Sequence, residues 1–350
     1  MSSTNVNDRN VLQLGAIAVL VAGLAFLPGA SRTNCGMTPE VASGLFYPTQ
    51  DRPEEDTNLT RVDNWPGEAR GEIIHVRGQV LDEACRPIEN ASVELWQADA
   101  HGRYQHERHH LSVPLDSNFQ GWARAVTDVQ GRYGFKTVKP APYPVDEESA
   151  EFRSPHIHFR VTHPEHYELI TEMYFAEQPL NKTDSVLQQL PAEEREQITV
   201  RPSADENARG PVYSFDLTLS ALKPDLVSPE LLDRYVGTYQ LEARGKIRTL
   251  ETRTVQISRD GNRLYVNTAS LSRRMELRPL SESRFDTGGM GGDEIQFHPD
   301  EEGHPEAGPR KGPHASRSKG WRAEWGNRGA VAAPSRLRRD RSLFNGDFVP

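Results

Sequence analysis

The stretch Ser154-Pro-His-Ile-His-Phe-Arg160 carries more information about fold and function than any other part of this chain. On a β-strand, side chains at positions i and i+2 leave the same face. We therefore expect His156 and His158 to project together to one side. The residues that alternate with them form an apolar row on the opposite face: Ile157, Phe159 and Val161. Imidazole suits iron, copper, zinc and nickel, so the pair could supply half of a metal site. Two hydrogen-bonding histidines on a half-exposed strand are the alternative, since a His-x-His match alone is weakly specific.

Short β-runs surround this stretch on both sides. Alternating apolar residues and turn signals predict strands at 73–81, 91–97, 122–127, 134–138, 156–161 and 213–219. Short strands between turns are typical of an antiparallel β-sandwich. We predict a mainly β protein with such a sandwich over residues 71–226. A polar, irregular arm over residues 32–70 leads into it. A charged, helix-like patch near residues 184–196 lies between the later strands.

The composition changes near Pro229, where we place a domain boundary. Alternating runs at 254–258 and 263–267 predict a small β-rich C-terminal domain over residues 229–298. From 299 to 350, Gly, Pro, Arg and His crowd together and hydrophobic residues become sparse, which predicts a disordered tail. The sequence leaves open whether this tail is authentic or comes from a shifted reading frame.

The chain has 350 residues and a net charge of -9. This acidic balance argues against a nucleic-acid partner, because phosphate binding needs a cationic surface. Near the N-terminus, Arg9 precedes an apolar run over residues 11–27, and small residues follow Pro28. This order is typical of a signal peptide, here residues 1–31, and predicts a periplasmic or secreted protein without a stable membrane partner after cleavage. A membrane anchor through residues 11–27 is the alternative.

The chain has two cysteines, Cys35 and Cys85. Export favours a disulfide between the N-terminal arm and the first sheet, because disulfides persist in oxidising compartments. The sequence alone leaves their pairing open.

Two tyrosines precede the histidine pair in turn-like surroundings. Tyr104 follows a Gly-Arg pair, and Tyr143 is flanked by prolines that fix the backbone. With His156 and His158 they offer two phenols and two imidazoles. Phenolate is a hard anion that favours iron(III) over zinc, and a metal ionises tyrosine well below its free pKa of about 10. Two phenolates would leave an iron(III) site with a net charge of about +1, ready for an anionic ligand. A packing role for the tyrosines is the alternative.

The stretch from Gly71 to about Pro191 resembles the catalytic domain of intradiol ring-cleavage dioxygenases, closest to the protocatechuate 3,4-dioxygenase type. The matching runs are Val93-Glu-Leu-Trp-Gln-Ala-Asp-Ala-His-Gly-Arg-Tyr104, Pro114-Leu-Asp-Ser-Asn-Phe-Gln-Gly-Trp122, Thr127-Asp-Val-Gln-Gly-Arg-Tyr-Gly-Phe135, Tyr143-Pro144 and Arg153-Ser-Pro-His-Ile-His158. The family holds non-haem iron(III) with two Tyr and two His. The order and spacing of those residues here fit that pattern.

The resemblance implies a non-haem iron(III) dioxygenase that cleaves a catechol-type aromatic diol with O2 to a cis,cis-muconate product. Tyr104 and His156 would be equatorial iron ligands, and Tyr143 and His158 axial ones. Tyr143 would also leave the metal when substrate binds and accept one of its protons. Arg153 corresponds to a family arginine beside the substrate that stabilises charge building on the ring.

Two positions depart from the pattern. Glu172 stands where the protocatechuate type usually has Gln, and Val145 follows Tyr-Pro where some members have Trp. Both residues are expected at the substrate pocket, so the identity of the diol stays open.

Two other functions remain as alternatives. The first is a non-catalytic, transthyretin-like β-sandwich that binds a ligand without turnover. The second is a copper or zinc hydrolase that uses only the histidines. The sequence also leaves open whether the chain forms a homo-oligomer and what its C-terminal domain does.

Overall fold

The structure is a computed structural model of the chain. It describes residues 35–41, 44, 46–48, 56–109, 111–145, 149–203, 205, 208–242, 254–268, 273–288, 293–299, 321–327 and 335–339. The predicted signal segment, residues 1–31, lies outside this range. The helices within the described residues all fall short of the length and apolarity needed to cross a bilayer.

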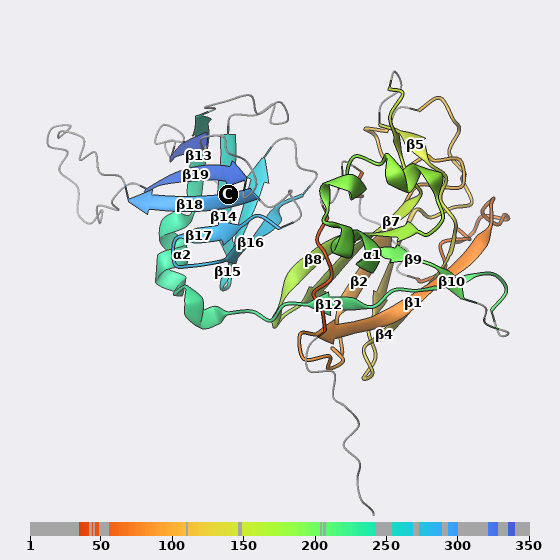
Figure 1. The fold of residues 1–350 in the computed structure, drawn as a ribbon, viewed down its shortest axis with the longest axis horizontal. Helices are drawn as coiled ribbons and strands as arrows, with labels where there is room; N and C mark the ends of the chain where they lie inside the picture. The colour runs from red at the N-terminus through yellow and green to blue at the C-terminus, as the bar shows by residue number, and fades with distance from the viewer. Residues whose placement is uncertain are drawn as a thin grey trace, which may run out of the picture. The chain divides into compact units, whose positions relative to one another are not determined.

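Two five-stranded sheets form a β-sandwich in the described part of the chain (Figure 1). The first has the order β10-β11-β1-β12, with β4 also paired to β1; its strands are β1 (Ile73–Asp82), β4 (Arg132–Val138), β10 (Pro202–Ser203), β11 (Val212–Ser214) and β12 (Leu217–Leu219). The second has the order β3-β2-β7-β8-β9; its strands are β2 (Ser92–Trp96), β3 (Trp122–Val126), β7 (His156–His163), β8 (His166–Phe175) and β9 (Thr199–Val200). The predicted mainly β sandwich is confirmed, with parallel pairing where β11 and β12 join β1 and where β9 joins β8.

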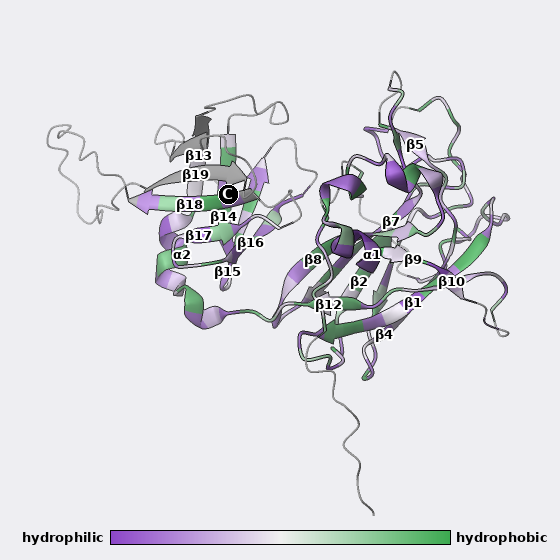
Figure 2. Cartoon of the chain, viewed as in Figure 1, coloured by the Kyte–Doolittle hydropathy of each residue, from purple (hydrophilic) through white to green (hydrophobic). Residues whose placement is uncertain are grey.

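The core of the sandwich lies between the two sheets. Alternate residues of β1 point inward and are fully buried, as are those of β2 and β7 that face them: Ile74, Val76, Val80, Val93, Leu95, Ile157, Phe159 and Val161. Burying a side chain of this size stabilises the fold by about 1.5–3 kcal/mol. Figure 2 shows hydrophobic and hydrophilic segments along these strands, whereas the short helix α1 (Ala192–Gln197) is hydrophilic.

The predicted strand 213–219 is two strands rather than one. Between them, the Phe215 carbonyl passes so close to Gly78 that an added Cβ on that glycine would lie 1.9 Å from the oxygen. Asp216 accepts a hydrogen bond from the backbone N–H of Gln79 at 2.9 Å. These contacts interrupt the ladder with β1, so β11 and β12 pair with its two ends separately.

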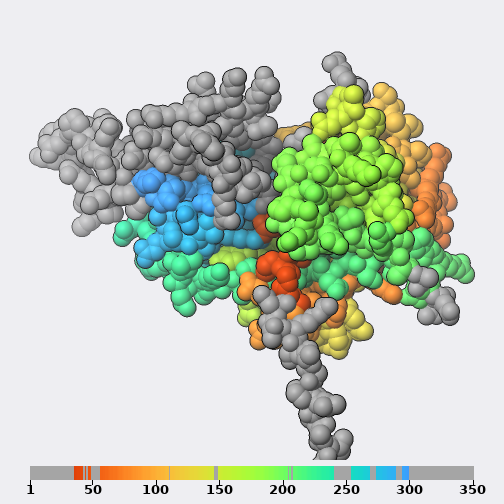
Figure 3. All heavy atoms as spheres, viewed as in Figure 1, coloured from red at the N-terminus to blue at the C-terminus, as the bar shows by residue number. Residues whose placement is uncertain are grey.

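A two-stranded ribbon and a helical segment flank the second sheet. The ribbon pairs β5 (Tyr143–Pro144) with β6 (Phe152–Arg153). The segment holds the 3-10 helices η1 (Pro179–Lys182) and η2 (Leu187–Gln189) and the helix α1, where a helix-like patch was predicted. Its residues form part of the bright green surface in Figure 3. At the N-terminal arm, Cys35 is bonded to Cys85, which answers the open question of their pairing.

The C-terminal part is a closed β-barrel with its own core. The 3-10 helix η3 (Pro224–Leu226) and helix α2 (Pro229–Tyr235) precede it, and Ser228 caps α2 by accepting a hydrogen bond from the Leu231 N–H. The barrel strands are β13 (Gly237–Glu242), β14 (Thr254–Asp260), β15 (Arg263–Thr268), β16 (Met275–Pro279), β17 (Arg284–Asp286), β18 (Asp293–Pro299), β19 (Trp321–Asn327) and β20 (Ser335–Arg339).

The last two strands correct the prediction of a disordered tail over residues 299–350 at residues 321–327 and 335–339, whereas the other residues after 299 lie outside the described part of the chain. β19 pairs with β18, and β20 pairs with β19 and β13, so together they close the barrel. The sequence of β19 alternates apolar and polar residues from Trp321 to Gly326, which is a strand signal that the surrounding Gly, Pro and Arg obscured. The small domain therefore extends beyond residue 298.

Candidate metal centre

The histidine pair lies on the face of β7 that is turned away from the sandwich core. His156 and His158 are both buried, with at most 2 % of their surface exposed. The residues that alternate with them fill the core instead, as the two-residue period of the strand predicts. In the antiparallel ladder with β8, His156 lies opposite Tyr174 and His158 lies opposite Glu172.

Four donor atoms converge at this face. The His158 Nε2 atom lies 3.0 Å from the Tyr104 hydroxyl oxygen and 3.2 Å from the His156 Nε2 atom. The same His156 nitrogen lies 3.4 Å from the hydroxyl of Tyr104 and 3.5 Å from that of Tyr143. Separations of this size are those expected of atoms that share one metal ion at about 2 Å from each. The structure thus brings together all four residues that the sequence singled out.

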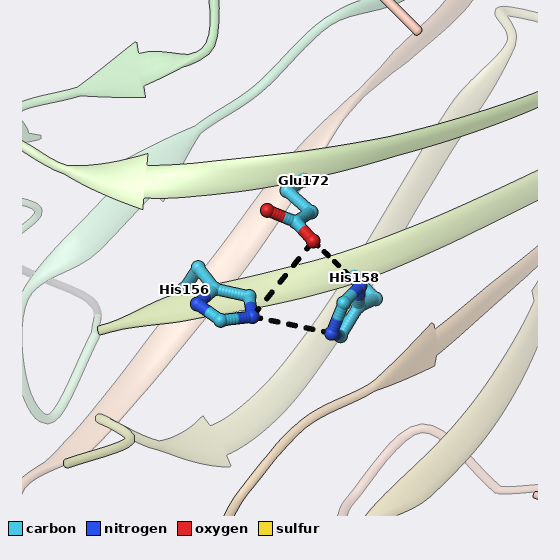
Figure 4. A group of neighbouring side chains, drawn as sticks. All are labelled: His156, His158 and Glu172. Atoms are coloured by element: carbon cyan, nitrogen blue, oxygen red, sulfur yellow. Dashed lines mark hydrogen bonds and ion pairs between the residues drawn. The ribbon is translucent and has the colours of Figure 1, made fainter. Parts of the chain in front are cut away.

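The outer ring nitrogens fix how each imidazole is presented. His156 Nδ1 lies 2.6 Å from the backbone carbonyl oxygen of Ser154, which is an acceptor, so Nδ1 carries the proton and Nε2 offers its lone pair. His158 Nδ1 faces the Glu172 Oε1 atom at 3.3 Å (Figure 4). The same Oε1 atom lies 3.9 Å from His156 Nε2, so Glu172 faces both imidazoles and is itself a possible metal ligand beside the two histidines.

The tyrosines reach the site from outside the second sheet. Tyr104 follows a turn after β2, and its backbone N–H donates to the Nδ1 atom of His109 at 2.8 Å. Tyr143 lies on β5, directly opposite Arg153 on β6. Gly102 in the turn before Tyr104 has a positive φ of 82°, and a Cβ there would meet the Pro142 carbonyl oxygen at 2.5 Å. The two tyrosine-bearing segments therefore pack against each other with no room for a side chain at this glycine.

Arg153 is held by two buried carboxylates. Its guanidinium donates to Glu172 at 2.7 Å and to Asp184 at 3.0 Å. It also donates to the hydroxyl of Tyr174 at 2.8 Å, and that hydroxyl donates in turn to Glu172. Asp184 accepts further bonds from the backbone N–H groups of Ser154, Val186 and Leu187 at 2.7–3.0 Å. The arginine is therefore fixed in direction by bonds from both sides.

Aromatic side chains enclose the donor set. The Trp96 ring stacks on the His158 ring at 4.7 Å between centroids, with the planes within 4° of parallel. Phe46 lies 4.8 Å from the Tyr104 ring and 6.1 Å from the Tyr143 ring. This packing restricts the rings and keeps bulk water away from the polar atoms.

Burial governs the protonation of these side chains. It raises the pKa of Tyr104 well above the ordinary value and raises the pKa of Tyr143 to about 12. It also lowers the pKa of His156 and that of His158. Both imidazoles are therefore in the neutral form that binds metals, whereas the phenols need a bound cation in order to ionise at neutral pH.

The pKa of Glu172 shifts in the direction that favours the charged form. Burial raises the pKa of its carboxyl, but the Arg153 guanidinium, the two imidazoles and the Tyr174 hydrogen bond together outweigh this effect, and the pKa falls to about 2. The site thus holds a permanent carboxylate beside a candidate metal ligand.

Several residues of the site escaped the sequence analysis. Asp184 and Tyr174 carried no recognisable signal beyond their residue type, and Trp96 was quoted only as part of a matching run. Of the two predicted pocket positions, Glu172 is buried in the site, whereas Val145 lies just after β5 with 45 % of its surface exposed.

Known proteins resemble this chain over the part that contains the sandwich. A family model described as Dioxygenase matches residues 43–221. The chain is 40 % identical over 177 residues to the protocatechuate 3,4-dioxygenase beta chain of Burkholderia cepacia. This match covers 49 % of this chain and 75 % of that protein. It is 34 % identical over 122 residues to a catechol 1,2-dioxygenase of Candida albicans, covering 32 % of this chain and 39 % of the relative. Among solved structures, 3-chlorocatechol 1,2-dioxygenase from Rhodococcus opacus 1CP matches with 22 % identity and a TM-score of 0.43, over 55 % of this chain and 76 % of that one.

The fold and the site define a β-sandwich protein with a buried Tyr–Tyr–His–His donor set. The family model spans half of the chain, and the chain covers 75 % of the Burkholderia relative. The chain belongs to the intradiol ring-cleavage dioxygenase family and is an oxidoreductase.

Proposed function

We propose that this protein binds one non-haem iron(III) ion and cleaves a catechol-type ring with O2 to a cis,cis-muconate product. The observation that carries the proposal is the convergence of four donor atoms, with neighbouring separations of 3.0–3.5 Å, in one buried site. A ligand-binding sandwich without turnover has no need of such a set.

The residues present fit iron(III). Tyr104 and Tyr143 would bind it as phenolates, and His156 and His158 would bind it through Nε2. Two phenolates favour a hard trivalent cation over the divalent zinc that a histidine-only site would take. The orientation of each Nε2 atom toward the tyrosines supports this use, because the outer nitrogens are occupied by Ser154 or face Glu172.

When bound, iron(III) would supply the electronic activation of a catecholate toward O2. The chain's own residues then have separate tasks. A catechol has to lose two protons to bind as a dianion, and the Tyr143 oxygen would receive one of them. The burial of Tyr143, which favours its neutral form, assists this transfer.

Arg153 would stabilise negative charge on the ring. It lies opposite Tyr143 in the β5–β6 ribbon, and guanidinium stays cationic at any pH of interest. Its bonds to Glu172 and Asp184 hold it in one direction, so no reorganisation is needed as charge develops. The aromatic cover of Trp96 and Phe46 would exclude water from the reacting atoms.

Metal analysis, visible spectroscopy and oxygen uptake test this function together. The purified protein should contain close to one iron per chain and show the red colour of phenolate-to-iron(III) charge transfer. It should consume O2 with at least one of catechol, protocatechuate and hydroxyquinol, and the product should carry both atoms of labelled ¹⁸O2. A colourless protein that holds zinc and consumes no oxygen would exclude the dioxygenase.

Tyr133→Phe is the matched control for exchanges at the tyrosine ligands. Tyr133 is also buried, but its hydroxyl donates to the Phe215 carbonyl, away from the histidines. Its loss should cost about 1 kcal/mol of stability and leave iron content and colour unchanged.

We also propose that the protein is exported and loses residues 1–31. The order of charged, apolar and small residues in this segment supports the proposal, and so does the Cys35–Cys85 disulfide, since disulfides persist outside the cytosol. N-terminal sequencing of the protein from fractionated cells tests it. Residues 1–31 retained on membrane-bound protein would favour the anchor instead.

A further inference from the structure

Glu172 places a carboxylate beside the imidazole pair, where an uncharged side chain would give the site a different net charge. It lies on β8 directly opposite His158, and its carboxylate points toward the imidazole pair (Figure 4). The side chain is 1 % exposed. Its Oε2 atom accepts hydrogen bonds from Arg153 and Tyr174. Its Oε1 atom has no hydrogen-bond donor among the described residues and faces His158 Nδ1 at 3.3 Å.

These contacts give the site a fixed negative charge. Arg153 cannot deprotonate, and its ion pair with Glu172 at 2.7 Å favours the ionised carboxylate, to which the Tyr174 hydroxyl also donates. When His158 binds a metal through Nε2, its Nδ1 atom carries a proton. That proton faces the same carboxylate. A glutamine here would have nearly the same shape but no charge.

The positive charge of Arg153 is therefore more than balanced by the carboxylates around it. Its single positive charge is met by two buried carboxylates, Glu172 at 2.7 Å and Asp184 at 3.0 Å. The three groups together carry one negative charge in excess. With Gln in place of Glu172, the arginine and Asp184 would balance, and the metal site would keep its net positive charge.

We propose that Glu172 selects the substrate by charge, so that the site accepts catechols without an anionic ring substituent and disfavours carboxylated ones. This inference rests on the proposed ring-cleaving function of the same site. The excess negative charge of Glu172, Asp184 and Arg153 cancels the net positive charge that the iron site would otherwise have, so a carboxylated catechol brings its extra negative charge into a buried site with nothing left to balance it. Like charges repel strongly where water is excluded.

Three diols separate charge from size. Catechol has no substituent, protocatechuate carries a carboxylate, and 3,4-dihydroxybenzamide carries a neutral amide of nearly the same shape in the same place. Each is titrated without oxygen into the iron-loaded full-length protein, and the change in the charge-transfer band gives its dissociation constant. We expect the benzamide to bind at least about tenfold more tightly than protocatechuate.

Variants then assign the preference to the charge of Glu172. Glu172→Gln should reduce the ratio of the two dissociation constants by about tenfold. Glu172→Asp keeps the charge and should keep the preference for the benzamide. Glu94→Gln is the matched control, because Glu94 is also buried and also accepts bonds from a tyrosine and an arginine, Tyr47 and Arg160. In the Glu94→Gln variant, the ratio of the two dissociation constants should equal that of the wild-type protein.

The outcomes separate this inference from the function on which it rests. Equal or tighter binding of protocatechuate by the wild-type protein overturns the inference, and so does an equal change in ratio for Glu172→Gln and Glu172→Asp. A protein that takes up no iron, or whose spectrum responds to none of the three diols, fails the proposed function itself.

Discussion

The two faces of strand β7 use the same backbone for opposite purposes. One face presents Ile157, Phe159 and Val161, which are fully buried in the sandwich core. The other face presents His156 and His158, which are nearly as buried but are surrounded by polar atoms. The side chains on both faces are thus almost completely buried, and only the groups that surround them differ.

This difference teaches where stability and chemistry reside. Apolar side chains in the core need only volume and shape, so related side chains can replace one another at modest cost. On the site face each imidazole presents one nitrogen to the other donor atoms, and a change of residue removes that donor atom outright. We therefore expect exchanges on the core face to change the free energy of unfolding and exchanges on the site face to change metal binding and turnover.

The largest expected effect lies on the core face. Phe159→Ala should lower the free energy of unfolding by about 3–5 kcal/mol, because it leaves a cavity between the sheets. Chemical denaturation measures this loss. At temperatures where the variant stays folded it should still bind iron. Loss of iron from a folded Phe159→Ala protein would mean that the two faces are not separable.

His158→Asn is the corresponding exchange on the site face. Losing even a residue that only orients a metal ligand typically costs 10–100-fold in affinity, so losing a ligand should weaken iron binding by at least about a hundredfold, or about 2.7 kcal/mol. Iron content after dialysis against a chelator measures it. His163→Asn, the same exchange at the end of the same strand, should retain its iron.

Tyr143→Phe sharpens the comparison within the site. The phenol is proposed both to bind iron and to accept a substrate proton, and general acid–base assistance is worth roughly 10²–10⁴-fold. Turnover measured by oxygen uptake should fall by about a hundredfold, while iron and colour persist through Tyr104. Tyr104→Phe should disturb the colour or the iron content more. Near-normal turnover in Tyr143→Phe would assign the proton to another group.

The smallest effect should come from Ile157→Val, between the two histidines. Removing one methylene from the core should cost about 0.5–1.5 kcal/mol of stability. Iron content and visible spectrum should match the wild type, since the neighbouring imidazoles face the other way. A changed spectrum would show that core packing adjusts the position of the ligands.

The sequence was sufficient for the parts that depend on periodicity. The alternation in residues 156–161 predicted both faces of β7, and the resemblance to the intradiol dioxygenases implied the set of two tyrosines and two histidines that the fold brings together. β8 was missed as a strand because Glu168 and Glu172, four residues apart, interrupt its apolar residues. Both are buried and paired with arginines. Such pairing depends on residues far away in the chain, which periodicity does not encode.

Asp184 is a second residue whose burial could not be predicted from the sequence around it. Its neighbours in the sequence predict a charged, helix-like patch, yet the Asp184 side chain is fully buried against Arg153 and the Ser154 backbone. Local composition cannot reveal a partner that lies about thirty residues earlier in the chain.

The position of Asp184 also constrains how this protein can diverge. Surface connections usually tolerate insertions and deletions well. The connection between β8 and α1 is an exception, because one carboxylate in it ties the loop to Arg153 and to the residue two places before the first histidine ligand. A change in its length would withdraw that carboxylate from the site. Variation in loop length should therefore accumulate at turns such as 128–131, whereas the β8–α1 connection must be inherited at constant length together with the chemistry.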